Sequence, residues 1–166
     1  MSRFPNDCNN PPSFRPRLIG CVSQDIRMAR AIGECYQCEL YAIAAYLWRS
    51  LLCERQDREL STLCEQYARE EIEHFRLLGE LIVSLGGRPA LYTQVKIDPA
   101  NYPREDGAAC VRQMMCEAIA DERQMIDRYQ TLMGKSSDRV VRSILAGLIS
   151  DAHRHVERLE STFCGA

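Results

Sequence analysis

Residues 68–85 read A-R-E-E-I-E-H-F-R-L-L-G-E-L-I-V-S-L, and the rest of the chain is organised around this stretch. Its apolar residues recur at intervals of three and four, which predicts an amphipathic helix. Glu71 and His74 lie three positions apart, so on a helix the carboxylate and the imidazole leave the same face one turn apart. This is a geometry for binding metal, but the spacing is common in helices. Whether Glu71 and His74 bind a metal depends on further ligands from other helices.

The composition is that of one ordinary globular domain. The chain has 166 residues, of which 46% are hydrophobic and 27% charged, enough to bury a core without disulfides. The net charge of −2 gives no electrostatic reason to expect nucleic acid or an anionic membrane as partner. No apolar run approaches the ~18 residues of a membrane span, and no signal peptide is visible. We expect a soluble, cytoplasmic protein.

Nine cysteines are present, an odd number in a chain without a secretion signal. This favours reduced thiols over a disulfide framework. Most of them fall within helical patterns, where cysteine packs as a small apolar residue.

The first half of the chain predicts an arm followed by a helical hairpin. Residues 1–22 are rich in proline and have no periodic pattern, so they form the arm. Helical periodicity begins after Ser23, an expected N-cap, and a polar break at residues 54–58 separates a first helix from a second that ends at Gly86-Gly87. The break is short, which predicts antiparallel helices.

The second half predicts another hairpin. Residues 86–106 contain three prolines and are too many for a tight turn, so we expect a long crossover. Two more helices follow, from about residue 107 to 133 and from about 139 to 161, and residues 162–166 are left as a tail. Two helical hairpins joined by one long connection are typical of an all-α, ferritin-like four-helix bundle, here spanning residues 23–161.

The helices also resemble two copies of one hairpin, in which each odd-numbered helix offers a Glu and each even-numbered helix a His. The corresponding residues are Glu34 and Tyr41 with Glu122 and Tyr129, and His74 with His155. Each Glu lies seven residues before its Tyr and so shares a face with it, whereas Glu39 and Asp127 are rotated by about 140° and are expected to face solvent. A carboxylate among apolar residues is costly unless a cation meets it, which favours a pair of metal ions at the bundle centre.

With these residues the chain resembles the ferritin-like di-metal carboxylate proteins of the rubrerythrin and manganese-catalase group. The family motif has one Glu on each of helices 1 and 3 and Glu-x-x-His on each of helices 2 and 4. The resemblance implies two metal ions, iron or manganese, and redox chemistry on peroxide, dioxygen or ferrous iron. The implied ligands are Glu34, Glu71, His74, Glu122 and His155, with Glu34, Glu71 and Glu122 as catalytic residues.

Helix 4 departs from the motif, because Ala152 stands where the family has Glu. Asp151 is the nearest substitute: it lies four residues before His155, about 40° away around the helix, and we assign it as a further ligand. The alternatives are that water fills the position, that only one metal binds tightly, or that the site is degenerate.

Other side chains are expected next to the ligands. Tyr41 and Tyr129 either bond to ligand carboxylates or pack as core aromatics. Cys38 lies four residues after Glu34 and points toward the same interior, either as an inert thiol or with a redox or ligand role. The charged residues expected at the surface are Glu70, Glu73 and His153.

The preferred interpretation is a dinuclear metal oxidoreductase. A metal store or carrier with little turnover and a structural coat or shell protein are the alternatives. The chain lacks the repeated Cys-x-x-Cys of a rubredoxin-like module, so electrons, where needed, come from an external donor protein. Residual apolar residues such as Trp48 and Leu52 favour a homodimer.

Overall fold

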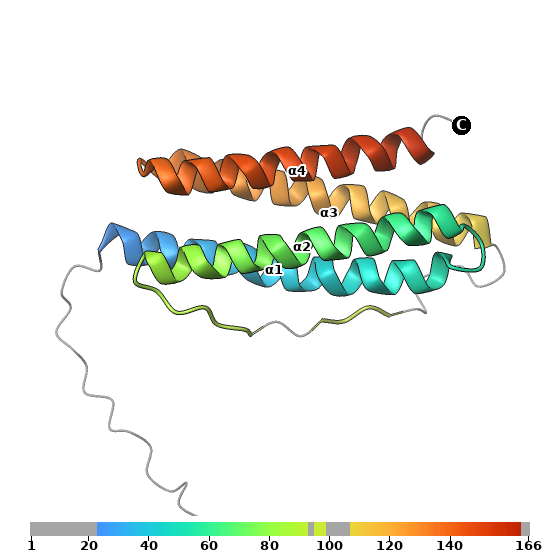
Figure 1. Ribbon diagram of the computed structural model, residues 1–166, viewed down its shortest axis with the longest axis horizontal. Coiled ribbons are helices and arrows are strands. Elements are labelled where there is room, and N and C mark those ends of the chain that lie inside the picture. The colour runs from blue at the N-terminus through green and yellow to red at the C-terminus, as the bar shows by residue number, and fades with distance from the viewer. Residues whose placement is uncertain (1–22, 93–94, 99–106, 164–166) are drawn as a thin grey trace, which may run out of the picture.

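The computed structural model describes residues 23–92, 95–98 and 107–163, and these ranges contain four long helices and no strand (Figure 1). The helices are α1 Gln24–Cys53, α2 Arg58–Ser84, α3 Gly107–Lys135 and α4 Arg139–Phe163. The all-α prediction is confirmed. The predicted arm and part of the crossover lie outside the described residues, and α4 continues into the segment expected to be a tail.

Side chains at the helix starts fix where the helices begin. Ser23, Asp57 and Asp138 each accept a hydrogen bond from a backbone N–H two or three residues further along the chain, which satisfies donors that the helix cannot. The chain leaves α2 at Gly86, whose φ of 77° lies in the left-handed region that favours glycine. These local signals divide the chain into two hairpins.

The hairpins lie against each other as the topology requires. In Figure 1, α1 lies beside α2, and α3 lies beside α4. The described parts of the connection between α2 and α3 run back along the α1–α2 pair, where the Tyr92 N–H donates to Gln37 Oε1 at 2.9 Å. This long return places α3 beside α1, so that all four helices share one interior.

The interior is apolar at both ends and polar in the middle. One cluster of buried side chains includes Leu60 and Met115, and a second cluster includes Ile32 and Leu145. Between the two clusters, along α1, α2 and α3, lie buried charged residues: Glu39, Glu71, His74 and Glu122. Buried ionisable groups are costly unless they are paired, so this layer requires an explanation that packing does not give.

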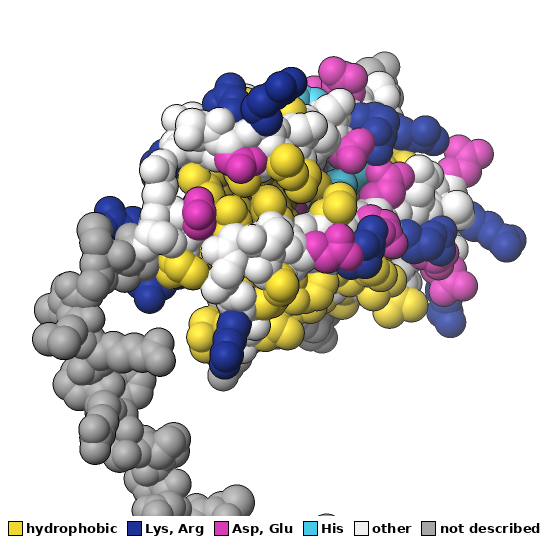
Figure 2. Space-filling view, turned by 60° about the vertical axis from the view of Figure 1, so that its left-hand side comes forward, with side chains coloured by type: hydrophobic (Ala, Val, Ile, Leu, Met, Phe, Trp, Pro, Cys, Tyr) yellow, Lys and Arg dark blue, Asp and Glu magenta, His cyan; other side chains and the backbone are white. Residues whose placement is uncertain are grey.

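The surface mixes charges of both signs. Figure 2 shows basic and acidic side chains next to one another, with hydrophobic side chains gathered among them. On α2, for example, Arg76 contacts both Glu73 and Glu80. Within the described ranges, no helix is both long and apolar enough to cross a membrane.

The cysteines of the described residues are free thiols. Burial raises the pKa of Cys35 and of Cys64 to about 12, so both remain protonated at neutral pH. This agrees with their expected role as small core residues.

Candidate metal centre

Five buried side chains from all four helices form two groups that share one member. Glu39 of α1 groups with Glu71 and His74 of α2, and Glu71 also groups with Glu122 of α3 and His155 of α4. In each group, one ligand-type atom per residue lies within 4.8 Å of the others. The five residues are at most 6% exposed. The five side chains therefore meet in the interior, away from solvent.

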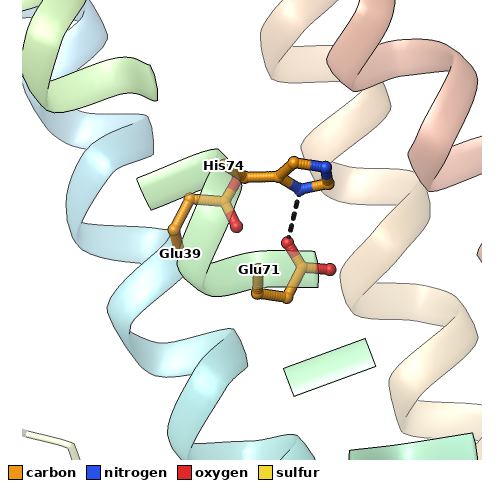
Figure 3. A group of neighbouring side chains, drawn as sticks. All are labelled: Glu39, Glu71 and His74. Carbon is orange, nitrogen blue, oxygen red and sulfur yellow. Dashed lines mark hydrogen bonds and ion pairs between the residues drawn. The ribbon is translucent and has the colours of Figure 1, made fainter. Parts of the chain in front are cut away.

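Figure 3 shows the first group, in which Glu39 projects from α1 toward Glu71 and His74 on α2. His74 Nδ1 lies 2.7 Å from Glu71 Oε2. The Tyr129 hydroxyl of α3 donates a hydrogen bond to Glu39 Oε1. The carboxylate from α1 is thus held from the opposite hairpin.

The second group uses the other oxygen of the shared carboxylate. His155 Nδ1 lies 3.3 Å from Glu71 Oε1 and 3.1 Å from Glu122 Oε1. The Tyr46 hydroxyl donates to Glu122 Oε1 at 2.6 Å. Because the two oxygens of Glu71 face different groups, this carboxylate would serve both groups if each held a cation.

Each imidazole is held from behind by an outer carboxylate. His155 Nε2 lies 2.9 Å from Glu70 Oε2, and His74 Nε2 lies 3.3 Å from Asp151 Oδ2. Arg154 joins these carboxylates, with Nη2 at 2.7 Å from Glu70 and Nη1 at 2.6 Å from Asp151. Contacts of this kind fix ring orientation and tautomer at metal sites, and they leave both Nδ1 atoms facing inward.

Without a cation, protons balance the buried charge. Burial, assisted by the charge of Glu71, raises the pKa of Glu39 well above its ordinary value. Burial also acts to raise the pKa of Glu71, but hydrogen bonds with His155 and His74 outweigh it and lower that pKa. Burial acts to lower the pKa of His155, yet its hydrogen bonds with Glu122 and Glu71 raise it to about 10. The site therefore carries exchangeable protons that a bound cation would replace.

The donor set fits two first-row transition-metal ions. Three carboxylates and two imidazoles combine the oxygen and nitrogen donors that iron and manganese accept. Two divalent cations would also offset the carboxylate charge that protons otherwise balance.

Comparison with known proteins gives the family. Residues 30–163 match the Ferritin family, described as a ferritin-like domain. The chain belongs to the ferritin-like family. No protein with a curated description matches it in sequence.

Three bacterioferritin structures have this ferritin-like fold. That of Desulfovibrio desulfuricans, which has a diiron site, is 18% identical with a TM-score of 0.73, covering 85% of this chain and 80% of that chain. That of Rhodobacter capsulatus is 22% identical with a TM-score of 0.70, covering 83% and 84%. Mycobacterium tuberculosis BfrA is 19% identical with a TM-score of 0.68, covering 82% and 83%. These neighbours give no support to the narrower resemblance to rubrerythrin and manganese catalase.

The prediction of which α1 side chains face the bundle centre was wrong. Glu34 is exposed, and Glu39, which was expected in solvent, is 2% exposed and faces the centre. The buried face of α1 includes Cys35 and Tyr36, four and three residues before Glu39. The apolar neighbours of Glu34 in sequence had suggested burial, but adjacent residues point in different directions on a helix. Asp127 is exposed, as expected.

A signal for Glu39 was present in the sequence. Glu39 lies seven residues before Tyr46, just as Glu122 lies seven before Tyr129, and this pairing spans 83 positions. The His74 and His155 pairing spans 81 positions, so the Glu39 alignment is more consistent with it than that of Glu34, which spans 88.

The neighbours of the centre differ in part from expectation. Tyr129 does bond to a buried carboxylate, whereas Tyr41 is partly exposed and Tyr46 makes the equivalent bond. Cys38 is half-buried, and burial raises the pKa of its thiol. Glu73 and His153 are exposed as expected.

Asp151 and Glu70 also lie differently from expectation. Asp151 contacts the outer nitrogen of His74, on the far side of the ring from Glu71, and belongs to neither ligand group. Glu70 was expected at the surface, but it contacts His155 and is only partly exposed. The side chain of Ala152 is buried, and among the described residues neither ligand group includes a carboxylate from α4.

A cavity of about 360 Å³ adjoins the centre. It is lined by residues of the centre on α1, α2 and α3, by other residues of α1 and α3, and by Ala152 of α4. The lining includes Glu39, Glu71, His74, Glu122, Tyr46, Tyr129, Ala152, Arg49, Asp121, Cys38, Tyr41 and Glu34.

Proposed function

We propose that the chain binds two iron ions at the five-residue centre and oxidises ferrous iron with dioxygen or peroxide. The observation that carries this proposal is the position of Glu71, whose two oxygens face His74 and His155 in the two ligand groups. The diiron site of the D. desulfuricans bacterioferritin, which has the same fold, supports iron over manganese.

The proposed ligands are Glu39, Glu71, His74, Glu122 and His155. Bound iron would supply the one-electron redox steps. Tyr129 and Tyr46 hold the carboxylates of Glu39 and Glu122, while Asp151 and Glu70 orient the two imidazoles. Metal ligation requires Glu39 without its proton and neutral imidazoles, so iron binding would release the protons that these groups hold.

Anaerobic titration with ferrous iron, followed by exposure to dioxygen or to peroxide, tests the proposal. We expect two iron ions per chain and rapid growth of ferric absorbance. Glu71→Ala should abolish both, because it removes the shared ligand, whereas Glu73→Ala on the exposed face of the same helix should change neither. Absence of bound iron, or equal loss in both variants, would contradict the assignment.

Iron storage is the second candidate, because the similar structures are bacterioferritins. A store must assemble into a shell and retain far more iron than two ions per chain. Exposed apolar residues on α1, namely Leu47, Leu51 and Leu52, support at least a homodimer. Size-exclusion chromatography with iron analysis of each fraction separates the cases: large assemblies that retain iron favour storage, and dimers holding two ions per chain favour turnover.

A further inference from the structure

Two carboxylates just outside the metal centre contact histidines of the opposite helix. Glu70 on α2 lies four residues before His74, yet its Oε2 contacts His155 Nε2 on α4 at 2.9 Å. Asp151 on α4 lies four residues before His155, yet its Oδ2 contacts His74 Nε2 on α2 at 3.3 Å. The equal spacing of four residues reflects the internal repeat, and the outer contacts of the two rings are crossed between the helices.

Arg154 on α4 joins the two crossed contacts. Its Nη2 lies 2.7 Å from Glu70 Oε2 and its Nη1 lies 2.6 Å from Asp151 Oδ1, so one guanidinium holds both carboxylates through separate nitrogens. The repeat gives Arg154 no counterpart on α2, where Glu73 stands one residue before His74. The link is therefore a feature of α4 alone and not of the repeated hairpin.

Together with the inner carboxylate, these contacts form a closed loop. Glu71 contacts His74 Nδ1 through Oε2 at 2.7 Å and His155 Nδ1 through Oε1 at 3.3 Å. The two imidazole rings are 25° from parallel, with centroids 6.3 Å apart. The members of the loop, in order, are His74, Glu71, His155, Glu70, Arg154 and Asp151. A shift of one ring therefore disturbs the partners of the other ring from both sides.

The outer half of the loop depends on an arginine that must be ordered. The Arg154 side chain is 55% exposed, and an isolated surface ion pair gains little against the side-chain entropy that it loses. Arg154 makes two such contacts, and a metal ion at either ligand group fixes the ring behind one of them. Arg154 is then ordered once for both groups, so the second ion meets a ring whose outer partner is already in place.

We propose that Arg154 is a positioning residue that couples the two ligand groups, so that iron at one group strengthens binding at the other. The coupling passes along the outer half of the loop, from one imidazole to the other, and adds to the effect of the shared Glu71. The coupling between two iron ions rests on the proposed function, whereas the coupling between the two rings is a property of the metal-free protein.

Nuclear magnetic resonance of the metal-free protein at neutral pH tests the coupling of the rings. Among the described residues, the ring that Asp151 contacts is His74. Asp151→Ala also removes one acceptor of Arg154, so the Nε2–H of His155 should exchange with water roughly fivefold faster or more. In Arg154→Gln, both rings should exchange faster, and adding Asp151→Ala should change His155 no further. Unaltered exchange at His155 in Asp151→Ala would overturn the inference.

Anaerobic calorimetric titration with ferrous iron tests the coupling of the ions. Arg154→Gln should still bind two ions per chain, but the ratio of the second binding constant to the first should fall roughly fivefold or more below that of the parent. Arg158→Gln is the control, because this exposed arginine one turn further along α4 takes part in no ion pair among the described residues. An unchanged ratio in Arg154→Gln, or an equal fall in Arg158→Gln, would overturn the inference.

The two experiments separate this inference from the proposed function. A parent chain that binds no iron contradicts the proposed function, and the exchange of the ring protons still decides whether Arg154 couples the rings. Two iron ions in the parent with an unchanged ratio in Arg154→Gln overturn the inference and leave the iron site intact.

Discussion

Tyr46 on α1 donates a hydrogen bond of 2.6 Å to Glu122 on α3, 76 positions further along the chain. Tyr129 on α3 returns the contact by donating to Glu39 on α1. The two tyrosines thus cross-link the hairpins through the carboxylates that face the centre. Because each Tyr lies seven residues after the Glu of its own helix, the reciprocal pair reflects the internal repeat of the sequence.

Loss of this cross-link should lower stability. Tyr46→Phe removes a buried donor from Glu122, and we expect the free energy of unfolding of the metal-free protein to fall by about 1–3 kcal/mol. Tyr41→Phe, at a partly exposed position of the same helix, should change it far less. Urea unfolding followed by circular dichroism measures both, and equal effects would contradict the role given to Tyr46.

Glu39 and Glu34 provide the second prediction, which compares a buried and an exposed carboxylate of α1. Burial raises the pKa of Glu39 well above its ordinary value, which favours the neutral form. Glu39→Gln, whose side chain is also neutral, should therefore change the metal-free thermal midpoint little while lowering bound iron. Glu34→Gln should leave both unchanged, because that side chain is exposed. Iron loss in Glu34→Gln instead would restore the facing that sequence alone predicts.

Sequence reasoning predicted the four helices and named four of the five residues that the structure brings together, because these depend on local signals. Helix caps, glycines and apolar periodicity divide the chain correctly, and the Glu71 and His74 spacing identifies the central helix. The error on α1 arose because Glu34 and Glu39 each lie seven residues before a Tyr. The offset of 83 positions between Glu39 and Glu122 favours Glu39, and the packing of α1 against α2 and α3 buries that side chain. Packing also decides the place of Asp151, whose contact with the outer side of His74 depends on the relative position of α2 and α4.

Asp151 provides a third prediction. As an outer partner of His74 rather than a ligand, it should affect affinity and leave stoichiometry intact. Asp151→Ala should weaken iron binding roughly 10–100-fold while saturating iron still reaches two ions per chain. Glu70→Ala, which removes the equivalent partner of His155, should behave alike. A loss of one whole iron ion in Asp151→Ala alone would instead make Asp151 a ligand.

The last prediction concerns pH. The pKa of His155 is raised from 6.5 to about 10 in the folded protein, so its protonated form stabilises the metal-free fold. This contribution is fully present below pH 6.5 and is lost as pH rises toward 10. The thermal midpoint of the metal-free protein should therefore fall across this interval.

The apparent affinity for a divalent cation should rise over the same interval, because the cation competes with fewer protons. The exposed His153 supplies the control. His153→Gln should keep the slope of midpoint against pH, whereas His155→Gln should flatten it. Differential scanning calorimetry at several pH values between 6.5 and 10 measures the slope, and an unchanged slope in His155→Gln would show that other groups bind the protons.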